Sequence, residues 1–139
     1  MKKFIFITAF IIMAGIAYGQ TYEKGNVIGQ HVVNIVLDPD VTFNQYKDFM
    51  INKYIPEFNK VLKGDIKLYI AEGERGADVN CISFLYVFKS VEMRDKYFDE
   101  QGQATELANS KFGQLSAIGE ERDKLGTSIG KHYTDWVMQ

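Results

Sequence analysis

Four runs rich in β-branched and aromatic residues constrain the fold of this chain most, because each run predicts a β-strand. They cover residues 30–37, 66–72, 80–88 and 129–138. Residues 42–62 separate the first two runs and residues 91–118 the last two, and both segments repeat apolar residues every three or four positions. That spacing predicts amphipathic helices. The order is therefore strand, helix, strand, strand, helix, strand, and no linker or internal repeat divides it.

Local signals place the ends of the helices. Thr42 and Gln45 have the spacing of a capping box, so a helix is expected to start at Thr42. Pro56 is expected to break this helix after about residue 54 and to leave only a short helical turn beyond it. Ser90 is expected to cap the start of the next helix. Residues 119–126 are charged and predict a loop.

This order of elements predicts an α+β fold. A helical connection between the first two strands makes them parallel, with a right-handed crossover. The second and third strands form a hairpin. The simplest closure is a ferredoxin-like split βαβ arrangement, in which a four-stranded antiparallel sheet has both helices on one face.

The face of the sheet opposite the helices is also expected to be covered. On the first strand the two faces are His31, Val33, Ile35 and Leu37 against Val32, Asn34 and Val36, so neither face is fully polar. A sheet that is apolar on both faces usually buries both. A second copy of the chain is the expected cover, which predicts a barrel-like homodimer. A cavity between sheet and helices, or between the two sheets, would take a small apolar or aromatic ligand.

Three segments carry a resemblance to a known superfamily: residues 54–76, 84–98 and 132–137. Together they resemble the dimeric α/β-barrel superfamily, and within it a group of small uncharacterised exported bacterial proteins. The superfamily includes antibiotic-biosynthesis-type monooxygenases, haem-degrading enzymes, muconolactone isomerases and stress-response dimers. The resemblance implies a homodimer, and it transfers no particular activity.

The first 19 residues predict a cleavable signal peptide. Met1 is followed by two lysines and then by an uncharged apolar run over residues 4–16, and Ala17 and Gly19 stand at the small-residue positions of a cleavage site. The apolar run is short for a membrane span, which needs about 20 residues. Cleavage would leave a flexible leader over residues 20–29 and a single domain over residues 30–139. The expected location is the periplasm or the cell exterior.

Composition excludes several classes of function. Cys81 is the only cysteine, so neither an internal disulfide nor a cysteine metal cluster is expected. The formal net charge is −2 and the basic residues are not clustered, which argues against nucleic acid as a partner. The mature chain offers no basic amphipathic helix, so no membrane contact is expected after cleavage.

Ligand-binding candidates lie in the turn after the second strand and on the following helix. Arg75, with Glu72 nearby, could present a guanidinium to a carboxylate or a phosphate. The alternative is a solvated turn with a local ion pair. Arg94 and Tyr97 lie on the helix after the third strand. Alternatively, Arg94 is a surface residue or ties the helix to Glu72, and Tyr97 is a core residue.

Catalytic candidates lie on the last strand. His132 could act as a general base or as an axial haem ligand, and the alternative is a structural histidine. Tyr133 and Asp135 share one face and could form a polar patch inside a barrel with Asn34 and Ser83. The alternative is a buried hydrogen-bonded cluster that fixes the dimer. His31 is expected opposite residues 137–138, several residues from His132, so no metal site is predicted.

The leading hypothesis is an exported homodimer that binds a small molecule without a cofactor, and whether it is an enzyme stays open. The alternative is a cofactor-light monooxygenase or isomerase that uses His132, Tyr133, Asp135 or Arg75 around an apolar pocket. A haem-binding protein is the third candidate. An enzyme predicts a cavity where two or more of these polar groups converge. A plain dimer module predicts a filled interior and an exposed apolar sheet face.

Overall fold

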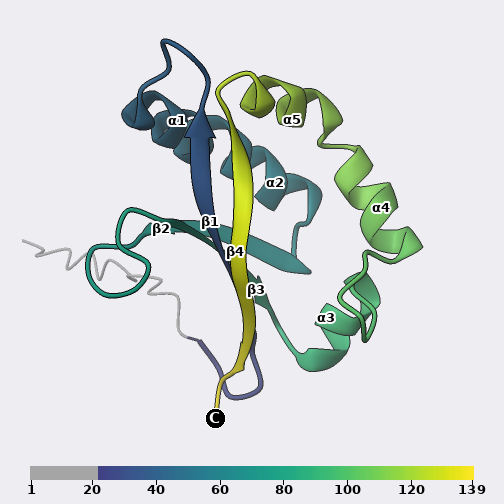
Figure 1. Ribbon diagram of the computed structural model, residues 1–139. Coiled ribbons are helices and arrows are strands. Elements are labelled where there is room, and N and C mark those ends of the chain that lie inside the picture. Colours follow the sequence, from purple (N-terminus) through teal and green to yellow (C-terminus); the bar gives the residue numbers. More distant parts are fainter. Residues whose placement is uncertain (1–21) are drawn as a thin grey trace, which may run out of the picture.

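The computed structural model describes residues 22–139, so the predicted signal peptide, 1–19, lies outside the described residues. Its centre is a four-stranded sheet of β1 (Val27–Leu37), β2 (Ile66–Glu72), β3 (Ile82–Phe88) and β4 (Gly126–Val137) (Figure 1). The strand order is β2-β3-β1-β4, and all three neighbouring pairs are antiparallel. This order is that of a ferredoxin-like split βαβ arrangement, so the predicted α+β fold class is confirmed.

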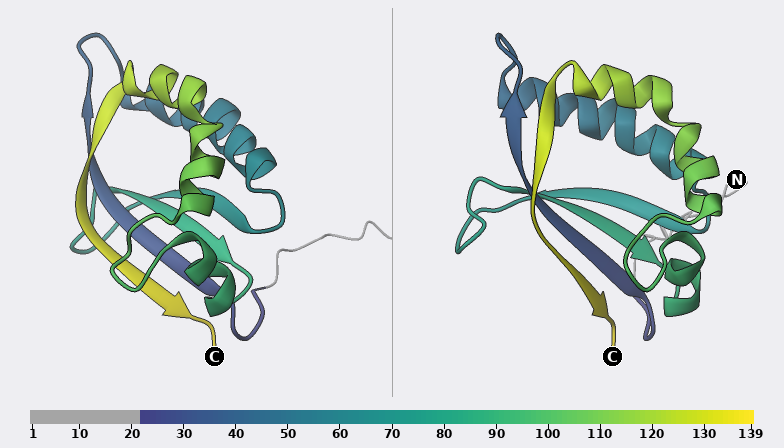
Figure 2. Two further views of the ribbon diagram at one scale, coloured as in Figure 1. Left: turned by 90° about the vertical axis from the view of Figure 1, so that its right-hand side faces the viewer. Right: turned by 45° about the vertical axis from the view of Figure 1, so that its right-hand side comes forward.

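The helices lie together on one face of the sheet (Figure 2). Between β1 and β2 run α1 (Phe43–Phe49), the π-helix η1 (Met50–Tyr54) and α2 (Ile55–Val61). Between β3 and β4 run α3 (Val91–Tyr97), α4 (Glu106–Gly113) and α5 (Ser116–Asp123). Within residues 22–139, none of these helices has the length and apolarity that crossing a membrane requires.

The first helical segment begins as predicted but does not break at Pro56. Thr42 and Gln45 form the capping box. The Thr42 side chain accepts from the backbone N–H of Gln45, and the Gln45 side chain accepts from the backbone N–H of Thr42. Pro56 lies in the first turn of α2, directly after the π-helical turn. The N–H of Ile55 donates to the carbonyl of Met50. The chain therefore remains helical from α1 to α2.

The second helical segment is longer than predicted. Ser90 caps α3 as expected, with its hydroxyl accepting from the N–H of Met93. The predicted loop at residues 119–126 is wrong, because α5 continues to Asp123 and β4 starts at Gly126. The polar composition of this segment reflects an exposed helix face, which charge alone does not distinguish from a loop.

The core lies between the helices and the inner face of the sheet, here the face that bears Val33, Leu68 and Phe84. Side chains alternate along each strand, so the neighbouring positions form the outer face. Three large apolar side chains stand exposed on the outer face: Val36 (54%), Ile129 (52%) and Trp136 (56%). The sheet is thus covered by helices on one side only within the described part of the chain.

Candidate functional site

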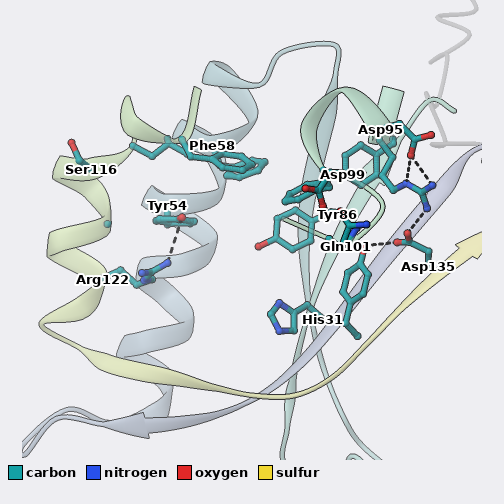
Figure 3. Close-up of a pocket in the computed structure, with 18 of the residues that line it drawn as sticks. His31, Tyr54, Phe58, Tyr86, Asp95, Asp99, Gln101, Ser116, Arg122 and Asp135 are labelled. Carbon is teal, nitrogen blue, oxygen red and sulfur yellow. Dashed lines mark hydrogen bonds and ion pairs between the residues drawn. The ribbon is translucent and has the colours of Figure 1, made fainter. Parts of the chain in front are cut away.

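A cavity of about 1080 Å³ opens between the inner face of the sheet and the helices. Its walls come from β1, β3 and β4 on one side and from α2, α3, α4, α5 and the loop after α3 on the other (Figure 3). Seven aromatic rings line it: Tyr54, Phe58, Tyr86, Phe88, Phe98, Phe112 and Tyr133. Several of them contact each other, such as Phe58 and Phe112, which stack at 6.0 Å between centroids. The site is therefore a largely aromatic pocket between two layers of structure.

A polar cluster occupies one end of the cavity. The Asp135 carboxylate on β4 accepts from Arg94 Nη1 on α3 at 2.5 Å and from the hydroxyl of Tyr133. Arg94 also contacts Asp95 Oδ1 at 2.7 Å. The side chains of Arg94 and Asp135 are only 25% and 21% exposed. Partial shielding from water strengthens such a charge-assisted pair.

Gly29 makes room for this cluster. It lies opposite Asp135 in the pairing of β1 with β4. A Cβ atom at this position would come within 2.8 Å of the Tyr133 hydroxyl and 3.2 Å of Asp135 Oδ1. Any larger residue would therefore displace the Tyr133–Asp135 hydrogen bond.

Two phenols in the cavity stay protonated well above neutral pH. Burial, and then the hydrogen bond to Asp135, raise the pKa of Tyr133. Burial raises the pKa of Tyr86 to about 12. The Tyr86 hydroxyl lies between the two ends of the cavity and has no hydrogen-bond partner among residues 22–139 (Figure 3). Tyr86 can therefore donate a hydrogen bond to a bound molecule, whereas the Tyr133 hydroxyl already donates to Asp135.

An arginine marks the opposite end of the cavity. The Arg122 guanidinium on α5 lies over the ring of Tyr54, 5.2 Å from its centroid, and contacts Asp123 Oδ1 at 2.6 Å (Figure 3). The cavity is therefore bounded at each end by a guanidinium that already has a carboxylate partner.

The structure brings together three of the residues proposed from the sequence: Arg94, Tyr133 and Asp135. Tyr97 is instead fully buried and donates to Asp65 Oδ2 at 2.5 Å, so it belongs to the core. The suggestion that Arg94 ties its helix to Glu72 is wrong, because the β2 carboxylate of Glu72 pairs with Lys47 at 2.9 Å.

Arg75 lies exposed in the connection between β2 and β3. Neither it nor Glu72 lines the cavity. Both ligand-binding candidates, Arg75 in this connection and Glu72 at the end of β2, therefore lie outside the pocket that the described residues form.

His132 and Asn34 lie on the outer face, away from the cavity. His132 pairs with Val32 across the sheet, and its Nε2 lies 3.3 Å from Asp78 Oδ2. Asn34 accepts a hydrogen bond from Cys81 Sγ at 3.2 Å. The predicted polar patch of Asn34 with Tyr133 and Asp135 is therefore wrong. A haem between sheet and helices could not use His132 as its axial ligand.

His31 lies on the inner face and lines the cavity. Its strand partner is Tyr133, and the two rings meet edge to face at 6.0 Å. The expected position opposite residues 137–138 is wrong because β1 starts at Val27 rather than at Gln30. The polar, glycine-containing composition of the residues before Gln30 predicted a leader there, so the strand positions 27–29 were missed. His31 and His132 consequently lie on opposite faces of the sheet.

Several lining residues with polar groups were not among the sequence candidates, among them His31, Tyr54, Tyr86 and Arg122. Tyr86 does fall on the inner face of a predicted strand, which was the available signal. Arg122 lies in the segment predicted as a loop, so nothing indicated its direction. Within residues 22–139, no group of three or more His, Cys, Asp and Glu side chains is placed to hold a metal ion.

Comparisons with known proteins assign this chain to no family. The sequence matches no family model and no curated protein. One similar solved structure is a dimeric protein of unknown function and ferredoxin-like fold from Bacteroides fragilis. It is 12% identical, with a TM-score of 0.45 over 84% of this chain and 100% of that chain. The fold assignment stands on the strand order.

Proposed function

We propose that this domain binds a small, largely aromatic or apolar molecule in the cavity between the sheet and the helices. The observation that carries the proposal is a cavity of about 1080 Å³ whose lining includes seven aromatic rings. Pockets for small molecules typically enclose about 300–1,000 Å³ and combine apolar walls with a few polar groups. Arg94, Asp135 and Tyr133 supply such polar groups here. Binding of this kind involves no cofactor.

The test is to fill the cavity and measure binding of a neutral fluorescent probe, N-phenyl-naphthylamine. Gly119 lines the cavity on α5, and a Cβ there meets no atom within 4 Å, so Gly119→Trp can project into the space without a backbone clash. Gly113, on α4, also has open space around it but does not line the cavity. Gly113→Trp is therefore the matched control.

The expected result is a rise in probe fluorescence with the wild type and with Gly113→Trp, and its loss with Gly119→Trp. Native mass spectrometry of the proteins from an exporting host should also detect a bound small molecule in the wild type and in Gly113→Trp. Gly119→Trp should carry none. Equal probe binding by both variants would contradict the proposal, because the binding surface would then lie elsewhere.

A second candidate function, a cofactor-light enzyme of the isomerase or monooxygenase type, is favoured by one observation. Arg94, Asp135 and Tyr133 converge within hydrogen-bond reach at the cavity wall, as general acid–base chemistry requires. Asp135, whose charge Arg94 balances, could accept a proton from one position of the ligand, and the Tyr133 phenol could return one to another position. The check is deuterium uptake by the recovered ligand in deuterium oxide, which Tyr133→Phe should abolish without loss of binding.

We further propose that a second copy of the chain covers the outer face, as a homodimer. β4 is an edge strand, and it exposes apolar side chains on both faces, with Ile129 and Trp136 on the outer face and Tyr133 and Val137 on the inner one. A two-fold axis would place the exposed apolar outer face of one copy against the same face of the other.

Sedimentation of the wild type should give a dimer, and Trp136→Lys should give a monomer. Ile51→Lys, at an equally exposed apolar residue on η1, should leave the dimer intact. A wild type that stays monomeric at high concentration would contradict the homodimer.

We also propose export to the periplasm or the cell exterior, which rests on the secretory pattern of residues 1–19. The mature protein is expected to begin at Gln20. An intact mass from the periplasmic or extracellular fraction of a bacterial host checks this. A full-length protein that stays with the cytoplasm would contradict export.

A further inference from the structure

We infer that the cavity's ligand is an organic cation, an amine carried on an apolar or aromatic body. This inference rests on the proposed function, because it concerns the ligand of the same pocket. It adds the sign of the ligand's charge, which the aromatic lining alone leaves open.

The formal charges around the cavity are strongly unbalanced. The lining has two guanidiniums, Arg94 and Arg122, against six carboxylates: Asp95, Asp99, Glu100, Glu120, Asp123 and Asp135. The whole chain has a net charge of only −2. Negative charge is therefore concentrated around this opening. A cleft lined by one sign of charge attracts ligands of the opposite sign and disfavours those of its own.

Both guanidiniums already have carboxylate partners. Arg94 contacts Asp95 and Asp135, and Arg122 contacts Asp123 through two of its nitrogens. An anionic ligand would have to displace a carboxylate from one of them. The lining therefore has no unpaired cation that could receive an acid.

Two carboxylates of the lining are available. The side-chain carboxylates of Glu100, in the loop after α3, and Glu120, on α5, have no hydrogen bond or ion pair with any residue in the range 22–139. They come from two different segments of the lining. An ammonium group entering the cavity would meet carboxylates that have no competing partner.

The aromatic walls also suit a cation. The cavity already holds one, since the Arg122 guanidinium lies 5.2 Å from the centroid of the Tyr54 ring. The faces of aromatic rings attract cations, more strongly where water is partly excluded. Phe58 and Phe112 continue this lining further into the pocket. The apolar body of an amine can lie against these rings while its charge stays near the carboxylates.

The test compares three molecules that share one ring system and differ in charge: naphthylmethylamine, naphthylmethanol and naphthoic acid. Calorimetry on the mature protein should give a dissociation constant for the amine at least about tenfold lower than for the acid, with the alcohol between them. The difference between amine and acid should narrow at high salt, because salt screens exposed carboxylates.

Glu100→Gln combined with Glu120→Gln should weaken amine binding about tenfold and leave binding of the alcohol unchanged. Glu121→Gln is the matched control, because Glu121 lies on the same helix and does not line the cavity. It should leave binding of all three molecules unchanged.

The outcomes separate the two proposals. Acid binding as tight as amine binding would overturn the cation inference while the pocket remains a binding site. Binding of N-phenyl-naphthylamine without binding of the amine would overturn it as well. Failure of the neutral probe and of all three naphthyl compounds would instead contradict the proposed function itself.

Discussion

The two faces of β4 place similar chemistry in different surroundings. On the inner face, Asp135 accepts from Arg94 and Tyr133 at the cavity wall, with the ion-pair side chains 25% and 21% exposed. On the outer face, Asp78 accepts from Lys131 at 3.0 Å and approaches His132 at 3.3 Å. The lysine and histidine side chains there are 38% and 46% exposed. The same strand thus carries a shielded cluster and a solvated one.

A bulge in β4 sets this arrangement. Val32 pairs with His132 while Val33 pairs with Gly130, so Lys131 is an extra residue in β4. A bulge redirects the side chains around it. It lets Lys131 and His132 both reach Asp78, while Tyr133 and Asp135 keep the inner face. The helices on the inner face, rather than the residue types, therefore decide which ion pair is shielded from water.

Two leucines on neighbouring strands give the largest expected contrast. Leu68 on β2 is 1% exposed on the inner face, and Leu85 on β3 is half-buried on the outer face. Leu68→Ala should lower the free energy of unfolding by about 2–5 kcal/mol, because it leaves a cavity in the core. Leu85→Ala should cost about 1 kcal/mol. Urea unfolding at low protein concentration measures both.

The two leucine variants should also differ in how their stability depends on protein concentration. If a second copy covers the outer face, the cost of Leu85→Ala should rise with protein concentration while that of Leu68→Ala should not. Equal costs for the two variants in a dilute monomer would mean that the outer face is already closed, and the contrast between the faces would be lost.

The inner cluster is expected to give the next largest effect. Asp135→Asn removes the charge that Arg94 and Tyr133 share, and it should cost about 1–2 kcal/mol, reduced by partial exposure. The pKa of Tyr133 should fall, because the carboxylate that favours the protonated phenol is gone. Titration of the labelled tyrosine ring by NMR measures the shift. An unchanged Tyr133 pKa in Asp135→Asn would mean that Asp135 does not raise the pKa of Tyr133.

Tyr86 links the cavity to alkaline stability. Burial raises its pKa from 10.0 to about 12, so above pH 10 the unfolded state loses a proton that the folded state keeps. The unfolded state then binds fewer protons, and stability falls as pH rises from 10 to 12, by roughly 2 kcal/mol for this group. Tyr86→Phe should remove that part of the slope and change little near neutral pH. If stability fell just as steeply with pH in Tyr86→Phe, ionisation of Tyr86 would not be the cause.

The fold could be predicted from the sequence because its signals are local. The bounds of β2 and the caps at Thr42 and Ser90 agree with the structure, since alternation and capping depend on residues a few positions apart. The order of elements then leaves few topologies, and the ferredoxin-like one is observed.

The site could be predicted only in part. Arg94, Tyr133 and Asp135 were separate candidates, but their convergence depends on the register of β4 against β1 and on the bulge at Lys131. Register is a non-local property, and a shift by one residue exchanges the two faces. The polar patch with Asn34 failed for this reason. Arg122 was missed because the helix that carries it was expected to be a loop.

The ion pairs of the outer cluster should contribute less to stability than those of the inner cluster. Asp78→Asn removes the partner of Lys131 and His132, yet exposed ion pairs contribute little because water and salt screen them. The shift in the urea midpoint should be smaller than for Leu68→Ala, Leu85→Ala and Asp135→Asn, and it should vanish at about 1 M salt. The loss in Asp135→Asn should persist at that salt concentration, because its charges are shielded by protein. A large, salt-resistant loss in Asp78→Asn would mean that the outer cluster is buried in solution, which a second copy on this face would explain.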